Sequence, residues 1–249
     1  MNTVPILNCE FGSVTLGETV DWARSWIASG QSGYICTVNV AILMMMRSDP
    51  NLQRFVDGAS LVVADGQPLV WASNLQDESL PERVTGVDLV EALCALADRE
   101  GFGVYFLGAK REVIETAANR LKERNPGLQI AGIADGYFGA DEAPERARAV
   151  RESGAKLLFV GMGVPRQEEF LESQWDELGI SLAVPVGGSF EVMAGTARRA
   201  PVFLQRIGME WAFRLAQEPR RLWKRYLVTN TQFIFHLLRS ATSSGPGSR

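Results

Sequence analysis

The sequence contains few of the residues that usually build metal sites and disulfide frameworks. Its one histidine, His236, stands among apolar residues near the C-terminus. A histidine-rich metal site is therefore excluded, and a histidine-dependent catalytic triad is not expected. The three cysteines, at positions 9, 36 and 94, form no CxxC pair. We therefore expect no disulfide framework and a reducing compartment.

Membrane-spanning and leader patterns are missing as well. No uninterrupted apolar stretch approaches the roughly 20 residues that cross a bilayer. The first residues, Met1 to Pro5, do not begin a basic region followed by an apolar one, so we expect no signal peptide. The sequence predicts a cytoplasmic protein.

Acidic residues are unevenly distributed and are not paired for metal binding. The chain has no Asp-x-Asp pair of the kind that holds Mg²⁺ against a diphosphate. Phosphate charge would then be met by arginine, lysine, backbone amides and helix ends. Between residues 198 and 239 there are nine arginines and lysines against two glutamates, whereas the whole 249-residue chain carries a net charge of −4. A basic C-terminal segment on an acidic body suggests an anionic partner: phospholipid, phosphorylated ligand or nucleic acid.

Apolar runs alternate with amphipathic stretches over most of the chain. This pattern predicts an α/β fold, a mostly parallel Rossmann-like sheet with helices on both faces. Strands are expected at 34–40, 61–64, 104–108, 128–133, 157–160 and 182–186. The predicted domains are a core over 1–196 (an N-terminal lobe of about 1–84 and a Rossmann-like lobe of about 85–196), a helical appendage over 197–239, and a disordered Ser/Gly/Pro-rich tail over 240–249.

Asp65 follows the apolar run 61–64 and precedes a glycine. Ligands bind at the carboxyl ends of strands in open α/β sheets, so Asp65 is a candidate catalytic base. Thr37 and Asn39 become its polar neighbours if their strand lies beside it. The alternative is an ordinary turn carboxylate, because Asp-Gly is a common turn pair. Arg83 is a candidate phosphate contact or, alternatively, a solvated loop charge.

Two glycine pairs each follow a predicted strand. Gly161 and Gly163 precede a helix, and Gly187 and Gly188 occupy the equivalent place after the next strand. Glycines let backbone amides approach a phosphate. The chain lacks the third glycine of the dinucleotide fingerprint and the Gly-Lys-Ser/Thr of a P-loop, so each pair alone could be a tight turn. Together they favour a nucleotide crevice.

The basic C-terminal segment also carries aromatic residues. Trp211, Trp223 and Tyr226 lie among arginines, a combination suited to a membrane interface. The alternative is a solvated basic face. Three arginines share one helical face if the helix continues through Pro219: Arg214, Arg221 and Arg225.

An ordered series of motifs covers roughly residues 34–230. It comprises Thr37-x-Asn39, Ala64-Asp65-Gly66-x-Pro68, Arg83-Val84-x-Gly86-x-Asp88-Leu89, Gly136-Tyr137-Phe138, Val160-Gly161-x-Gly163-x-Pro165-x-Gln167-Glu168, Gly187-Gly188-x-Phe190, Ala194-Gly195, Arg199-Ala200-Pro201, Glu210-Trp211, Arg214-Leu215, Glu218-Pro219-x-Arg221 and Arg225-Tyr226. This series resembles the bacterial WecG/TagA/CpsF glycosyltransferases, and the whole series is far more specific than any one motif.

The resemblance implies an inverting, metal-independent transferase without a cofactor. It would move a sugar from a UDP-sugar to a polyprenyl-diphosphate-linked sugar, as a peripheral protein on the inner face of the plasma membrane. The implied donor sugars are N-acetylmannosamine, its uronic acid, or glucose. Val40 and Glu191 depart from the family pattern, which leaves the donor open. By resemblance Asp65 is the base, Thr37, Asn39, Arg83 and Gln167 line the active site, and Arg214, Arg221 and Arg225 face the lipid diphosphate.

Two other classes of protein fit parts of the sequence. A soluble nucleotide-sugar epimerase or hydrolase would not need the basic aromatic segment. A membrane-recruited scaffold or a nucleic-acid binder using the basic segment would leave Asp65 and the glycine loops without a purpose. A non-enzymatic, membrane-recruited nucleotide-binding protein is a further alternative; the resemblance implies no nucleic acid. An unfilled apolar surface could also favour self-association.

Overall fold

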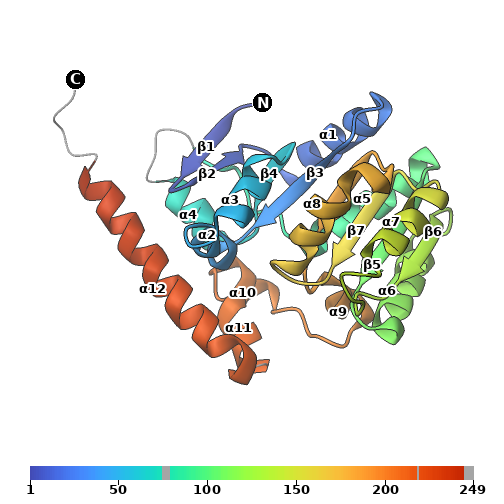
Figure 1. Ribbon diagram of the computed structural model, residues 1–249. Helices are drawn as coiled ribbons and strands as arrows, with labels where there is room; N and C mark the ends of the chain where they lie inside the picture. The colour runs from blue at the N-terminus through green and yellow to red at the C-terminus, as the bar shows by residue number, and fades with distance from the viewer. Residues whose placement is uncertain (75–78, 218, 244–249) are drawn as a thin grey trace.

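The computed structural model describes residues 1–74, 79–217 and 219–243, with the side chains of 221, 225, 226 and 240–243 left out. Its centre is a six-stranded sheet in the order β4-β3-β8-β7-β5-β6. Every neighbouring pair is parallel, which confirms the predicted α/β class (Figure 1). The strands are β3 (Gly33–Val38), β4 (Leu61–Ala64), β5 (Gly103–Gly108), β6 (Gln129–Ala134), β7 (Leu157–Gly161) and β8 (Leu182–Pro185).

Alternate residues of each strand enter two cores on opposite faces of the sheet. Phe106 and Phe159 belong to one core, whereas Tyr105 and Leu158 belong to the other, as the two-residue period of a strand requires. The first core is covered by α1 (Leu16–Ala28), α5 (Gly86–Glu100), α6 (Arg111–Arg124) and α9 (Ser189–Ala194). The second is covered by α2 (Val40–Met46), α3 (Pro50–Asp57), α4 (Gln67–Ser73), α7 (Ala143–Glu152) and α8 (Arg166–Leu178).

Strands from both predicted lobes join this one sheet, since β3 and β4 come from the first 84 residues and the other four from later ones. The carboxyl ends of β3, β4, β7 and β8 therefore lie along one edge. Where each lobe begins and ends as a unit remains a prediction.

An N-terminal hairpin was not predicted from the sequence. Strands β1 (Thr3–Ile6) and β2 (Cys9–Gly12) pair antiparallel, and the side chains of Val4, Ile6 and Phe11 are fully buried. The turn between them contains Leu7 at φ 56°. A leucine there gives none of the Asn-Gly or Asp-Gly signal by which hairpins are usually recognised.

The C-terminal segment, residues 197–243, contains the helices α10 (Val202–Arg206), α11 (Glu210–Gln217) and α12 (Pro219–Ser243). Pro219 begins α12, as expected of a proline in a first helical turn. The predicted tail is wrong for residues 240–243, which are helical; they contain no glycine or proline to stop the helix. The remainder of that tail, 244–249, lies outside the described residues. Figure 1 shows α12 extending past α2 and away from the sheet. None of the helices described is long and apolar enough to cross a membrane.

Candidate active site

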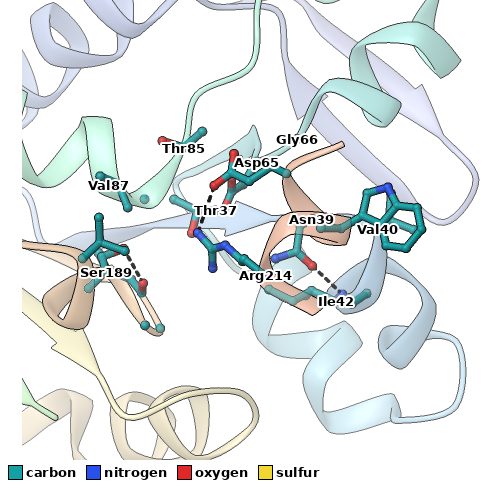
Figure 2. A pocket seen from close by; sticks show the side chains of 18 of the residues that line it. Thr37, Asn39, Val40, Ile42, Asp65, Gly66, Thr85, Val87, Ser189 and Arg214 are labelled. Carbon is teal, nitrogen blue, oxygen red and sulfur yellow. Dashed lines mark hydrogen bonds and ion pairs between the residues drawn. The ribbon is translucent and has the colours of Figure 1, made fainter. Parts of the chain in front are cut away.

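A cavity of about 410 Å³ lies at the carboxyl edge of the sheet. Residues that follow four different strands line it: Asn39 after β3, Asp65 after β4, and the glycine loops after β7 and β8. The helical C-terminal segment supplies the opposite wall through Glu210, Trp211 and Arg214. Residues far apart in the sequence thus meet around Asp65 (Figure 2).

The backbone around Asp65 explains how its carboxylate enters the cavity. The Asp65 N–H donates to the carbonyl of Val38 at 2.8 Å, which extends the pairing of β4 with β3 by one residue. Gly66 then adopts φ 148° and ψ 140°, a region essentially limited to glycine. Pro68 follows in the first turn of α4. The chain therefore turns sharply after Asp65 and leaves its side chain at the strand end.

Burial and four charges set the proton affinity of Asp65. Burial raises the pKa of its carboxyl most strongly, and Glu210 and Asp88 raise it further, whereas Arg214 and Arg83 lower it. The balance raises the pKa of Asp65 to about 6. A carboxylate with this pKa is ionised at neutral pH and is a better proton acceptor than an ordinary aspartate. Figure 2 shows the Arg214 side chain directed towards Asp65.

Thr37 and Asn39 both line the cavity, although each also has a structural contact. The buried Thr37 hydroxyl donates to the Pro185 carbonyl at 3.3 Å, which ties β3 to the end of β8. The Asn39 Oδ1 accepts from the Ile42 N–H at 3.1 Å and caps α2. These bonds fix both side chains next to Asp65.

Gln167 connects the two glycine loops. Its Oε1 accepts from the Gly187 N–H at 3.0 Å, and its Nε2 donates to Glu168 at 2.8 Å. Gly163 and Gly187 have positive φ values of 79° and 52°, so their backbones turn where other residues would be strained.

Three of the four predicted glycines line the cavity: Gly163, Gly187 and Gly188. Gly161 does not: it is buried at the end of β7, where a Cβ would lie 2.5 Å from the Phe190 ring. Its lack of a side chain makes room for that ring. The alternative of a packed turn therefore fits Gly161 better than a phosphate contact.

Arg83 lies in the cavity wall and is held by the C-terminal segment. Its Nη1 pairs with Glu210 Oε2 at 3.1 Å, and its side chain is 18% exposed. Its Nη2 donates to the Gln205 Oε1, while the Gln205 Nε2 donates to the Ala200 carbonyl at 2.7 Å. The other Glu210 oxygen, Oε1, pairs with Arg214 at 3.2 Å. The alternative reading of Arg83 as a solvated loop charge is therefore wrong.

Two further contacts join the C-terminal segment to the core. Arg199 pairs with Asp88 in the first turn of α5 at 2.6 Å. Burial alone would raise the pKa of Asp88, but hydrogen bonds from Arg199 and Thr85 hold it below its ordinary value. At Gly208, a Cβ would lie 2.8 Å from the Trp71 ring on α4. Sequence reasoning assigned no role to these contacts or to Gln205 and Glu210, because contacts between distant residues leave no local pattern. The available signals were that Glu210 is one of two acids in a basic segment and belongs to the motif Glu210-Trp211.

Several predicted residues lie elsewhere or cannot be placed. Arg221 and Arg225 belong to the α12 backbone, but their side chains lie outside the described part of the chain. His236 is on α12, packs edge-on against Phe235, and is not among the residues that line the cavity. Within the described residues, no three His, Cys, Asp or Glu side chains form a group that could hold a metal ion. Metal independence remains a prediction.

Comparison with known proteins decides the family. The family model described as "Glycosyl transferase WecG/TagA/CpsF family" matches residues 4–246. The chain belongs to this glycosyltransferase family. Its relatives include an N-acetylglucosaminyldiphosphoundecaprenol N-acetyl-β-D-mannosaminyltransferase of Bacillus spizizenii (strain ATCC 23059 / NRRL B-14472 / W23), 32% identical over 91% of this chain and 88% of that protein.

Proteins of the same name in two other bacteria are similar to this WecG/TagA/CpsF protein. The one from Bacillus subtilis (strain 168) is 28% identical over 91% of this chain and 88% of its own length. The one from Staphylococcus aureus (strain MW2) is 30% identical over 89% and 86%, respectively. The family assignment confirms the resemblance inferred from the motifs and agrees with a sheet-edge cavity built from those motifs.

Proposed function

We propose that this protein transfers N-acetylmannosamine from its UDP-sugar to a polyprenyl-diphosphate-linked N-acetylglucosamine, with inversion at the anomeric carbon. The proposal takes its donor sugar and acceptor from the names of the relatives. The observation that carries it is Asp65, a cavity carboxylate with a pKa raised to about 6. In an inverting displacement one carboxylate is sufficient, because the enzyme needs a base but no covalent intermediate.

The chemistry requires one proton transfer and one exchange of bonds. The acceptor hydroxyl oxygen attacks the anomeric carbon while Asp65 removes its proton. The bond between that carbon and the phosphate oxygen of UDP breaks, and UDP leaves with the electron pair. Thr37 and Asn39, fixed beside Asp65 by their hydrogen bonds, would position the hydroxyl that is deprotonated.

The leaving diphosphate needs positive charge around it. Helices α5 and α8, of 15 and 13 residues, both begin at the cavity wall, and a helix N-terminus favours an anion. The loop at Gly187 and Gly188 lets backbone approach the ligand closely. Arg83 and Arg214 add two guanidinium groups. These features support metal-independent stabilisation of UDP.

Transfer itself can be tested with purified protein, an N-acetylglucosaminyl-diphosphate lipid and a panel of UDP-sugars. We expect mass spectrometry to show an acceptor heavier by one N-acetylhexosamine with UDP-N-acetylmannosamine. Asp65→Asn should lower kcat by about 10²–10⁴-fold, the usual contribution of a catalytic base. A panel in which no donor yields a glycosylated acceptor would refute the proposal. Consumption of a UDP-sugar that does not depend on the acceptor would favour the hydrolase or epimerase alternative instead.

The lipid acceptor also requires contact with a membrane surface, which we assign to α12. Its outer side carries exposed apolar side chains together with exposed Arg220 and Lys224, a composition suited to an interfacial helix. The exposed apolar residues of α12 are Trp223, Leu227, Val228, Ile234, Phe235 and Leu238.

Vesicle sedimentation tests this assignment in the full-length chain. Phe235, 59% exposed, can be changed to Glu with little effect on packing. If Phe235 enters the lipid, Phe235→Glu should weaken binding to phosphatidylglycerol vesicles by about tenfold or more, because a buried Phe contributes roughly 1.5–3 kcal/mol. Asn119→Glu, on the exposed side of α6, adds the same charge elsewhere and should have little effect. Equal binding of both variants would contradict the assignment.

A further inference from the structure

Glu210 is the one carboxylate among the described residues that bridges an arginine of the core and an arginine of the C-terminal segment. Its Oε2 lies 3.1 Å from the Arg83 Nη1, and its Oε1 lies 3.2 Å from the Arg214 Nη2. The Glu210 side chain is 20% exposed. Each oxygen thus binds one guanidinium group, and all three residues line the cavity around Asp65.

Neither arginine is held there by its own element alone. Arg83 lies in the loop before α5, and it also donates to Gln205, which belongs to α10. Arg214 lies one turn after Glu210 on α11 and points towards Asp65 (Figure 2). Long arginine side chains lose considerable rotamer entropy when they are ordered. A carboxylate that binds both can offset that cost and keep the two groups close to the reacting atoms.

We propose that Glu210 is a positioning residue, which holds the guanidinium groups of Arg83 and Arg214 in their places around the Asp65 carboxylate. This inference rests on the proposed function for its kinetic consequences. Besides its own charge, which raises the pKa of Asp65, Glu210 acts through its ion pairs with the two arginines. Its shape matters as well as its charge, because only a side chain of the right length reaches both guanidinium groups.

A one-methylene change separates shape from charge. Glu210→Asp keeps the negative charge at the first residue of α11, where an acidic side chain suits the helix N-terminus. The shorter side chain cannot bridge both arginines at the present distances. The matched control is Glu172→Asp, because Glu172 forms an ion pair of 3.1 Å with Arg54 on the surface. Both variants lose one methylene from an ion-paired glutamate.

The expected result is a loss in kcat together with a change in the pH profile. When the arginines move away from Asp65, the pKa of its carboxyl rises, because both of them lower it at present. The acid limb of kcat/KM should therefore move to higher pH, and kcat should fall by about 10–100-fold through misplacement of the reacting groups. Glu172→Asp should change neither.

The charged groups that face Asp65 come from two sides. From α11 they are Arg214 and Glu210, and from the region that begins α5 they are Arg83 and Asp88. Asp88 is unchanged in the variant and continues to raise the pKa of Asp65 as in the native protein. Glu210 also raises that pKa, so withdrawal of its own carboxylate would move the acid limb to lower pH, whereas displacement of the arginines moves it to higher pH. A shift to higher pH therefore reports on the arginines.

Three results would overturn the proposal. The first is native kcat and a native acid limb in Glu210→Asp, which would show that charge alone suffices. The second is a lower KM with unchanged kcat, which would mean that Glu210 competes with the phosphates of the substrate. The third is a lower melting temperature with an unchanged pH profile, which would indicate a purely structural role.

A measurement without turnover keeps this inference separate from the proposed function. The difference in unfolding free energy between Asp65 and Asp65→Asn, followed against pH, reports the proton affinity of Asp65 directly. Measured in the native and the Glu210→Asp backgrounds, its midpoint should lie at higher pH in the variant background. If the native chain transfers no sugar, the proposed function fails, while this shift still supports or overturns the role of Glu210.

Discussion

Replacing Asp65 with Asn should make the protein more stable at neutral pH while removing its activity. The folded state raises the pKa of Asp65 from 3.8 to about 6, so folding disfavours the ionised form. Asn resembles the protonated carboxyl in shape and carries no charge. The substitution therefore removes the cost of holding an ionised carboxylate in a largely buried place.

The size of this effect follows from the pKa shift. A shift of roughly two units corresponds to about 3 kcal/mol, at 1.36 kcal/mol per unit. Below pH 3.8 the carboxyl is protonated in both states, so Asp65 costs nothing there. The cost grows between pH 4 and 6 as only the unfolded state ionises, and it is constant above about pH 6. Native stability relative to Asp65→Asn should therefore decrease as pH rises through this window.

Urea unfolding at a series of pH values provides the assay. At pH 7 the Asn variant should exceed the native protein by about 3 kcal/mol, and by pH 4 the two should nearly coincide. Asp88→Asn is the matched control with the opposite sign, because the pKa of Asp88 is lowered by its bonds from Arg199 and Thr85. That variant should be less stable than the native protein at pH 7, and the difference should shrink on acidification.

One outcome would refute this reasoning about Asp65. If Asp65→Asn is less stable than the native protein at pH 7, Arg214 and Arg83 stabilise the carboxylate by more than burial destabilises it. The pKa of Asp65 would then be depressed. The carboxylate would be a weak base, held mainly to pair with arginines.

Three further predictions concern the base and the contacts around it. The kcat/KM of transfer should fall about tenfold per pH unit below about pH 6, because the pKa of Asp65 is raised to about 6. A pH profile of kcat/KM that begins to fall only near pH 4 would contradict this. Gly66→Ala should destabilise the fold by about 1–3 kcal/mol in urea unfolding, because φ 148° strains any residue with a Cβ. Gly30→Ala should cost less, because Gly30 is exposed and its φ of 72° lies close to the left-handed region that other residues can adopt. Gly208→Ala should displace the Trp71 ring, which lies 2.8 Å from the added Cβ, and should increase proteolysis of the C-terminal segment. If adding Trp71→Ala does not reduce this proteolysis, the contact with the ring is not its cause.

Much of the fold and part of the cavity could be predicted because they depend on local pattern. Apolar runs such as 157–160 predict buried strands, and alternation with helices predicts a parallel sheet. Once the sheet is parallel, residues after its strands must share one edge. Asp65 and Gly187 are 122 positions apart, yet this rule alone brings them to one cavity.

The hairpin of β1 and β2 and the environment of Arg83 could not be predicted in this way. The strands of the hairpin are too short to show a clear two-residue period, and its turn contains Leu7 in place of the usual turn residues. The sequence therefore gives no local signal that predicts it. For Arg83, the sequence offered a free phosphate contact or a solvated charge. The structure gives it partners on α10 and α11, and those partners come from 122 and 127 residues further along the chain.

The position of Arg83 follows from how the basic segment is attached to the core. If charge alone attracted the segment to the acidic body, its arginines would pair with core carboxylates throughout. Arg199 does so, with Asp88. At Glu210 the direction is reversed, since a carboxylate of the basic segment binds an arginine of the core. General attraction between opposite charges would not select this pairing, so the contact of Glu210 with Arg83 favours one position of the segment over others. The result is that Arg214 is placed against Asp65, so the docking of the segment and the electrostatics of the base depend on the same few contacts.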